Sequence, residues 1–211
     1  MRTLNGSMNQ TQPELVTTTL LLQRLHDSAD DDAWRHFDAR FRRVIISTGL
    51  RLGLSNSDAE EAAQETMFQA IRDYQANRYD RSMGRLSSWI IGIARHRIID
   101  ILRRRREATL PGSGAEAIVE DPSEHLVGQV FEQSLERQIF SDAWEMIRAT
   151  GKSSLKTLQA FELTALRGVP AQEAARQCGM SVDQVYIARN RVAQRLREMV
   201  QRIDEAVRDG L

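Results

Sequence analysis

The feature that most constrains the fold of this chain is the stretch of residues 85–107, RLSSWIIGIARHRIIDILRRRRE. On a helical wheel at about 100° per residue, its apolar side chains occupy more than half of the circumference. These apolar residues are Leu86, Trp89, Ile90, Ile91, Ile93, Ala94, Ile98, Ile101 and Leu102. The remaining strip is narrow and partly cationic, and the consecutive arginines of residues 103–106 end the stretch. We therefore predict an α-helix that is buried on most sides and carries a cationic strip.

Charge is segregated along the chain, although the formal net charge is zero. Residues 78–107 hold 9 arginines and 3 acids, residues 107–145 hold 9 acids and 1 base, and residues 186–202 hold 5 arginines and 1 acid. Two basic segments separated by an acidic one suggest two contacts with a polyanion. For residues 103–106 alone, a merely solvated tail is an equal alternative.

Composition places the chain among soluble globular proteins, since 211 residues with 41% hydrophobic and 27% charged content suit one sizeable domain or two small ones. The sequence has no run of 18 apolar residues and no signal peptide at its N-terminus, so we expect a cytoplasmic protein without a membrane contact. A lone cysteine, Cys178, cannot form an internal disulfide, and the four histidines lack metal-site spacing. We expect no metal and no cofactor.

Three helices are predicted before the arginine-rich stretch. After a loose polar tail of residues 1–16, a short helix begins near Thr19, and a longer one follows the acidic residues 30–32, capped by an aspartate. Its apolar stripe consists of Trp34, Phe37, Phe41, Val44, Ile45, Thr48 and Leu52. Gly53 ends it, and a third helix runs from Asp58 to about Tyr74.

The third helix has a second face that carries acids around an aromatic residue. This face consists of Asp58, Glu61, Glu65, Phe68 and Arg72. An exposed phenylalanine among acids contributes nothing to a core and favours a docking surface. A single exposed phenylalanine tolerated by chance is the alternative. The polar loop that follows contains Asn77, Arg78, Tyr79 and Arg81, a combination that can stack on and clamp an unpaired base.

The second half of the chain predicts a separate helical domain. Residues 107–124 are rich in Gly, Pro, Ser and acids, which is typical of a linker. Helical periodicity resumes near Leu126, and after Gly168 a short helix opens at Pro170 and ends at Gly179. Ser181 can cap the last helix, so this end of the chain has a helix-turn-helix pattern, with an ordinary helical hairpin as the alternative.

Together, these segments resemble the bacterial sigma factors of the extracytoplasmic-function (ECF) class. The resemblance covers nearly the whole chain and rests on DAEEAAQETMFQA, on YDRSMGRLSSWIIGIARHRIIDILRRRR, on the linker and on the terminal helix-turn-helix, in that order. The family usually has Asp-Ala-Glu-Asp followed by Gln-Glu and an aromatic residue. Those places are taken here by Asp58, Ala59, Glu60, Glu61, Gln64, Glu65 and Phe68.

The resemblance implies an all-α fold and a sigma factor without enzymatic chemistry. The fold would be two small helical domains joined by a flexible acidic linker: a tail of residues 1–16, a region 2 domain of residues 17–107, a linker of residues 108–130 and a region 4 helix-turn-helix domain of residues 131–211. The implied partners are core RNA polymerase and promoter DNA, with an anti-sigma factor or a phosphorylation event left open as a regulator. The acidic linker would lie extended in the polymerase channel that otherwise carries RNA.

The same resemblance assigns site residues by position. Polymerase binding falls to Asp58, Glu61, Glu65 and Phe68. Capture of the minus-ten strand falls to Asn77, Arg78, Tyr79, Arg81, Arg85, Ser88, Arg95, His96 and Arg103. Major-groove contacts at the minus-thirty-five element fall to Gln184, Tyr186, Ile187, Asn190, Arg191 and Arg195. The family commonly has a Lys-Ser-Arg type run where this chain has Tyr186, Ile187 and Ala188, which puts the promoter sequence in doubt.

Two other classes of function are alternatives for this sequence. A stand-alone helix-turn-helix repressor or activator would use the last domain only, and would leave Glu61, Phe68 and the basic segment of residues 78–107 without a role. An enzyme is the third class, and the sequence offers it no nucleophile with a base, no ligand cluster and no phosphate loop.

Overall fold

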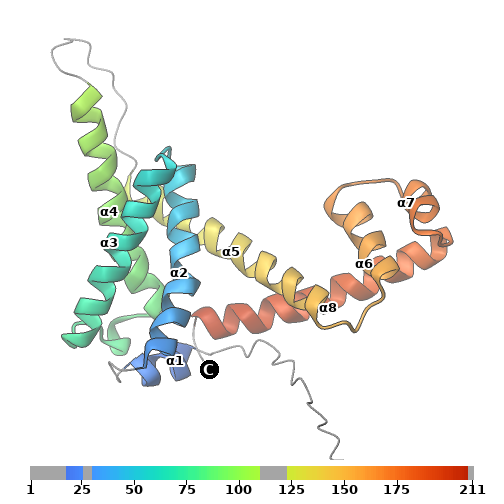
Figure 1. The fold of residues 1–211 in the computed structure, drawn as a ribbon, viewed down its shortest axis with the longest axis horizontal. Helices are drawn as coiled ribbons and strands as arrows, with labels where there is room; N and C mark the ends of the chain where they lie inside the picture. Colours follow the sequence, from blue (N-terminus) through green and yellow to red (C-terminus); the bar gives the residue numbers. More distant parts are fainter. Residues whose placement is uncertain (1–17, 26–29, 110–122, 209–211) are drawn as a thin grey trace, which may run out of the picture. The chain divides into compact units, whose positions relative to one another are not determined.

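The computed structural model describes residues 18–25, 30–109 and 123–208, and every regular element in them is a helix (Figure 1). The predicted all-α class is confirmed. The helices are α1 (Thr18–Leu25), α2 (Asp31–Arg51), α3 (Asn56–Gln75), the short 3₁₀ helix η1 (Arg81–Met83), α4 (Leu86–Thr109), α5 (Glu124–Ala149), α6 (Leu155–Phe161), the π-helical turn η2 (Glu162–Leu166), α7 (Ala171–Cys178) and α8 (Val182–Arg208). None of the described helices is long and apolar enough to cross a membrane.

The described chain divides into two compact units, residues 18–141 with 202–208 and residues 142–201. The end of α8 counts with the first unit, in which Arg208 donates to Glu132 of α5 at 2.7 Å. The predicted tail and residues 110–122 of the predicted linker lie outside the described residues. Residues 124–130, which the prediction assigns to the linker, are the first turns of α5. The domain boundaries and the path of the linker therefore stay predictions.

The first unit is built on α2, α3 and α4, whose starts the sequence explains. Asp30 caps α2 by accepting from the Ala33 amide, and Ser55 caps α3 by accepting from the Asp58 amide. The cap of α2 agrees with the predicted start, whereas α3 begins two residues before the predicted Asp58. The predicted stripe of α2 becomes core, with Phe37, Phe41, Val44 and Ile45 buried, and the buried face of α3 consists of Ala59, Ala62, Ala63, Met67 and Ala70.

Helix α4 is less enclosed than its sequence suggests. Its buried residues form one stripe, consisting of Leu86, Ser87, Ile90, Ala94, Ile98 and Ile101. Trp89, Ile91 and Ile93 are only half-buried, so the prediction of a helix covered on most sides is wrong. The reason is that α4 packs mainly against α3, which covers one face, and touches α2 much less. The apolar residues beside the stripe are left to line the surface.

An ion-pair cluster ties α1 to the start of α2. Arg24 donates from Nε to Asp30 at 2.7 Å and from Nη2 to Asp30 and Asp32 at 2.8 and 3.0 Å. The side chain of Asp30 also accepts from the Ala33 amide at 3.0 Å. The Arg24 guanidinium, and secondarily this amide, lower the pKa of Asp30 to about 2. The same carboxylate therefore holds two helices together.

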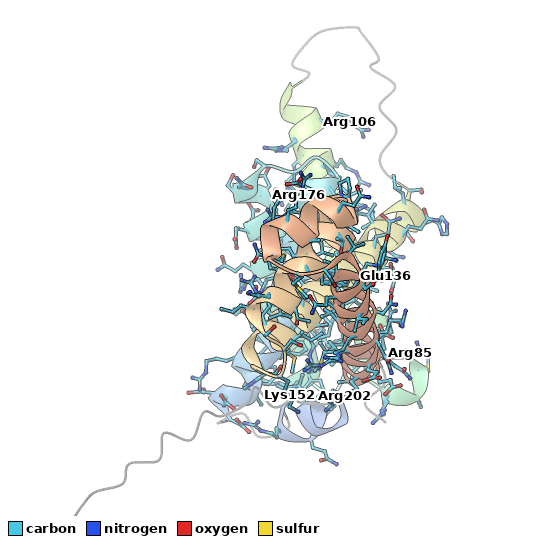
Figure 2. The ribbon with its side chains drawn as sticks, turned by 90° about the vertical axis from the view of Figure 1, so that its right-hand side faces the viewer. Arg85, Arg106, Glu136, Lys152, Arg176 and Arg202 are labelled. Atoms are coloured by element: carbon cyan, nitrogen blue, oxygen red, sulfur yellow. The ribbon has the colours of Figure 1, made fainter. Side chains whose placement is uncertain are left out.

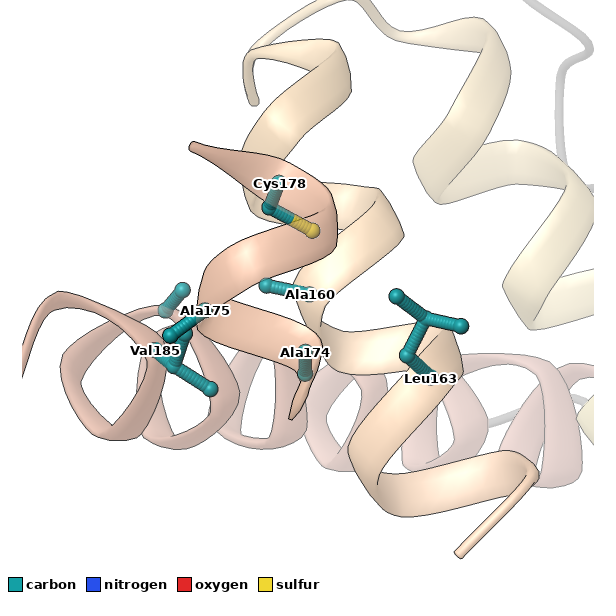
Figure 3. Packing of buried hydrophobic residues seen from close by; sticks show 7 residues of the cluster. Ala160, Leu163, Ala174, Ala175, Cys178 and Val185 are labelled. Atoms are coloured by element: carbon teal, nitrogen blue, oxygen red, sulfur yellow. The ribbon is translucent and has the colours of Figure 1, made fainter. Parts of the chain in front are cut away.

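In the second unit, α7 and the start of α8 pack on α6 through small side chains (Figure 3). The buried cluster consists of Ala160, Leu163, Ala174, Ala175, Cys178, Val185 and Ala188. Cys178 is a small core residue, as predicted. Pro170 precedes α7 instead of opening it, a shift of one residue, and Gly179 ends the helix with φ +60°, as the turn requires.

Substituting Gly179 and Gly128 by alanine should change the free energy of unfolding in opposite directions. Gly179→Ala should lower the free energy of unfolding by about 1–2 kcal/mol, because alanine is strained at positive φ. Space plays no part, since an added Cβ would meet only the Lys156 Nζ, at 3.8 Å. Gly128→Ala should raise the free energy of unfolding by about 0.5–1 kcal/mol, because Gly128 lies inside α5 with nothing within 4 Å of a Cβ. Urea unfolding of both variants measures this, and equal effects would contradict it.

The Arg24–Asp30 contact predicts a pH dependence. Because the pKa of Asp30 is lower in the folded chain than its ordinary 3.8, its charge stabilises the fold above about pH 4, and this contribution is lost as pH falls toward 2. Asp30→Asn keeps a capping oxygen but removes the charge. Its difference from wild type in the free energy of unfolding should therefore shrink between about pH 4 and 2. In an Arg24→Gln background the same substitution should lose most of this pH dependence, and an unaltered dependence would refute the assignment.

Candidate functional site

The predicted docking face on α3 is exposed at its aromatic centre. The side chain of Phe68 is 62% exposed, and the Arg72 guanidinium lies 4.9 Å from its ring centroid. A cation over the ring face holds the phenylalanine in place without covering it. The structure thus places an oriented apolar group on the surface, as the sequence predicts.

The acids of the same face are paired with arginines of α4. Arg97 lies 3.7 Å from Glu65, Arg104 lies 3.4 Å from Glu61, and Arg105 contacts Asp58. These pairs were not predicted, because the sequence does not show that α3 and α4 run side by side with these faces adjacent. Arg104 and Arg105 therefore do not form a free cationic tail; they share one surface of mixed charge with the acids of α3.

These ion pairs are weak enough to be exchanged. Glu61 and Arg104 keep 46% and 60% of their side-chain surface exposed, and such pairs contribute about 0–1 kcal/mol. Asp58 is different, because only 20% of its side chain is exposed and Ser55 donates to it at 2.9 Å. Asp58 consequently belongs to the start of α3 as much as to a docking face. Figure 2 labels Arg85 and Arg106 toward the two ends of α4, between which the other α4 arginines lie.

The loop before α4 is organised around Tyr79. Its ring lies 6.1 Å from that of Tyr74 and 5.1 Å from that of Trp89, and its hydroxyl donates to the Gly84 carbonyl at 3.2 Å. This partial burial raises the pKa of Tyr79. The loop turns at Asn77, a non-glycine residue with φ +55°. Tyr79 is therefore part of the wall of the site, not a freely swinging side chain.

An open cavity of about 380 Å³ lies between this loop and the start of α4. Its lining residues are Arg78, Tyr79, Asp80, Met83, Gly84, Arg85, Ser88 and Trp89. A neighbouring hollow of about 460 Å³ is lined by Asn77 and Arg81 on the other side of Tyr79. The structure thus brings six of the predicted minus-ten residues to one aromatic wall. Four lining residues are not among the predicted site residues: Asp80, Met83, Gly84 and Trp89. The apolar pattern of α4 assigns Trp89 to the core, and Met83, 86% exposed, belongs to no sequence motif.

Three predicted minus-ten residues lie further along α4, and one of them is covered. His96 and Arg103 are exposed, with His96 Nδ1 2.7 Å from the Gly92 carbonyl oxygen. Arg95 instead pairs with Glu124 of α5 at 3.1 Å, and its buried Nε has no hydrogen-bond partner. Arg95 is thus partly covered by the first turn of α5, with 29% of its side chain exposed.

Docking of α5 on the first unit is well anchored. Val127 is buried in a cluster that includes Ile98 and Ile101 of α4. Arg51 donates to the Val130 carbonyl at 3.1 Å and also contacts Gln133. The sequence does not predict this contact, because an apolar stripe shows that one face of α5 is buried but not which helix covers it.

On α8, five of the six predicted minus-thirty-five residues are exposed: Gln184, Tyr186, Ile187, Asn190 and Arg191. Gln184 and the half-buried Arg195 already have partners in the chain. Gln184 accepts from the Ser181 amide at 2.8 Å while Ser181 Oγ accepts from the Gln184 amide, which is a reciprocal cap. Arg195 donates to Ser153 Oγ at 2.5 Å. Among the described residues, no group of histidine, cysteine and acidic side chains could hold a metal ion.

Comparison with known proteins bears on the first unit. Residues 37–108 match the family model of sigma-70 region 2, and the ECF RNA polymerase sigma factor RpoE of Cereibacter sphaeroides is 32% identical over 87 residues. These two matches support an ECF sigma factor over the region 2 part of the chain. The aligned part is 41% of this chain and 47% of RpoE, so the chain spans about half the length of the relative that it matches.

A solved structure also aligns with this chain, but weakly. It is that of CnrH in complex with the cytosolic domain of CnrY, with 18% identity and a TM-score of 0.37 over 90% of this chain and 99% of that one. A likeness of this size says nothing about function. The family that the sequence predicts is therefore supported through region 2 alone.

The docking of α5 predicts a local response to one substitution. Val127→Asp places a charge in the apolar cluster, so the backbone amides of residues 124–133 should lose protection from hydrogen exchange. Gln129→Asp adds the same charge on the exposed side of the same turn and should leave the protection nearly unchanged. Hydrogen exchange with mass spectrometry measures both, and equal effects would disprove the anchoring role of Val127.

Proposed function

We propose that this chain binds core RNA polymerase, directs it to promoters and helps to open the duplex. The observation that carries the proposal is the aromatic cavity of Tyr79 and Trp89 at the start of the arginine-bearing α4, inside the residues that match sigma-70 region 2. The role is regulatory and non-catalytic. It is exercised in the cytoplasm, where the polymerase and promoter DNA are, and an anti-sigma factor is a candidate partner.

In this proposal the polymerase docks on α3 at Phe68, Glu61 and Glu65, with Asp58 at the edge. An exposed aromatic ring is a suitable anchor for a partner groove, and the surrounding acids favour a basic partner. The ion pairs to α4 do not oppose docking strongly, because exposed pairs are cheaply exchanged. Asp58 contributes mainly through the cap of α3.

The cavity beside Tyr79 would take an unpaired base of the minus-ten element. Stacking on an aromatic wall and bonding to polar groups at the rim, here Arg78, Arg85 and Ser88, is how proteins hold splayed bases. Asn77 and Arg81 would act in the neighbouring hollow. His96, Arg103 and, once Glu124 has left it, Arg95 would hold the strand's phosphates along α4.

The exposed face of α8 would enter the major groove at the minus-thirty-five element, as a helix following a tight turn does in helix-turn-helix proteins. Tyr186, Ile187, Asn190 and Arg191, which are exposed, would contact base edges. Gln184 and Arg195, which have protein partners, would support the helix and its phosphate contacts. A repressor using this helix alone remains the competing reading, and it predicts that the purified chain shifts duplex DNA without polymerase.

The docking surface gives the deciding experiment. Phe68→Ala should weaken binding of core polymerase at least about tenfold, because central aromatic anchors carry a large share of binding energy, and Glu65→Arg should also weaken it. Leu155→Ala removes a more exposed apolar side chain, 85% exposed, from the other unit and should have little effect. Affinity is measured by pull-down or fluorescence with the full chain. Unchanged binding by both α3 variants would refute the docking assignment.

A further inference from the structure

The exposed face of α8 contains an apolar residue that the fold does not need. Ile187 is 58% exposed, and the buried cluster of its unit contains its neighbours Val185 and Ala188 but not Ile187. Isoleucine is also no better than average as a helix former. Neither packing nor helix propensity selects an isoleucine here, and single exposed apolar residues are common. A binding role is therefore indicated only by the neighbours of Ile187 on the same face.

The position of Ile187 puts it among groups that recognise bases. Asn190 and Arg191 follow it by three and four residues, so the three side chains lie side by side on one face of α8. Asparagine can bond adenine through two atoms and arginine can bond guanine in the same way. An isoleucine beside them faces whatever lies next to those bases.

The chemistry of the major groove offers an isoleucine one partner. Among the base edges exposed there, only thymine presents an apolar group, its C5 methyl. We propose that Ile187 is a specificity-determining residue that recognises the methyl group of a thymine in the minus-thirty-five element. This inference rests on the proposed function, since it assumes that α8 enters the major groove of promoter DNA.

Two structural details support DNA over a protein as the partner of Ile187. The segment around it, residues 186–202, holds five arginines and one acid, which favours a polyanion and would repel a basic protein. Tyr186 is held by Arg189, whose guanidinium lies 5.6 Å from its ring centroid. The exposed apolar area is therefore set in a cationic surface.

The cap of α8 determines which turn can recognise bases. Gln184, one turn before Ala188, is bound to the amide of Ser181 and holds the start of the helix. Because the Gln184 side chain is bound to the Ser181 amide, Ile187, Asn190 and Arg191 are the residues available for contacts with bases. The proposed contact between Ile187 and the thymine methyl group therefore lies among the exposed residues of α8 that remain available to bases.

Deoxyuridine gives the experiment, because it differs from thymidine only in lacking the C5 methyl. Minus-thirty-five sequences are first selected from a promoter library with core polymerase and the wild-type full chain. Each thymine of the selected element is then replaced by deoxyuridine, and open-complex formation is measured. We expect one replacement to weaken the wild type by roughly three- to tenfold, the size of a lost methyl contact. The same replacement should not affect Ile187→Ala, and Ile187→Val should lie between.

Matched controls separate this contact from general damage. Asn190→Ala should keep the penalty for deoxyuridine, because its own contact is with another base. Deoxyuridine placed outside both promoter elements should have no effect with any variant. Both isoleucine variants are exposed on the helix and should unfold like wild type.

The outcomes distinguish a failure of the Ile187 inference from a failure of the proposed function. If Ile187→Ala suffers the same deoxyuridine penalty as wild type, or wild type suffers none, the methyl contact is refuted while promoter initiation stands. If Ile187→Ala instead lowers affinity for polymerase in the absence of DNA, Ile187 contacts protein and the inference is also refuted. If the wild-type chain with core polymerase selects no promoter at all, the proposed function itself fails.

Discussion

The packing of α4 on α3 is the contact on which the candidate site depends. The buried stripe of α4, from Leu86 to Ile101, lies on the alanine-rich face of α3, where small side chains allow close approach. That contact sets two surfaces at once. At the start of α4 it places Trp89 beside Tyr79, and toward the end it places Arg104 beside Glu61. A change in register between the two helices would dismantle both surfaces together.

Charge balance in the first unit follows from the same contact. The acids of α3 and the arginines of α4 are drawn from segments of opposite charge, yet in the folded chain they neutralise each other across the helix pair. Such exposed pairs add little stability. Their importance lies in availability, since Glu61 and Glu65 and their arginine partners can exchange these pairs for a partner of opposite charge at small cost, whereas Asp58 is held at the start of α3. Phe68 is uncharged and forms no ion pair, and it provides the apolar part of the surface.

Helix α5 makes the first unit larger than its sequence suggests. Val127 completes an apolar cluster with Ile98 and Ile101, and Glu124 covers Arg95. The buried Nε of Arg95 without a hydrogen-bond partner is a local cost of this arrangement. The strip of α4 expected to hold DNA is thus partly occupied by the chain itself, and the proposed strand capture at Arg95 requires the Glu124 pair to open.

Local patterns in the sequence determined the all-α class, most helix starts and the exposed faces of Phe68 and Ile187. They did so because caps such as Ser55, apolar periodicity and the positive-φ glycine at 179 act within a few residues. Only the tertiary structure decided which residues are in contact. Arg105 contacts Asp58, Tyr79 lies between Tyr74 and Trp89, and α5 partly covers Arg95. These contacts join residues far apart in the chain, and their geometry depends on how helices pack, which no local pattern encodes.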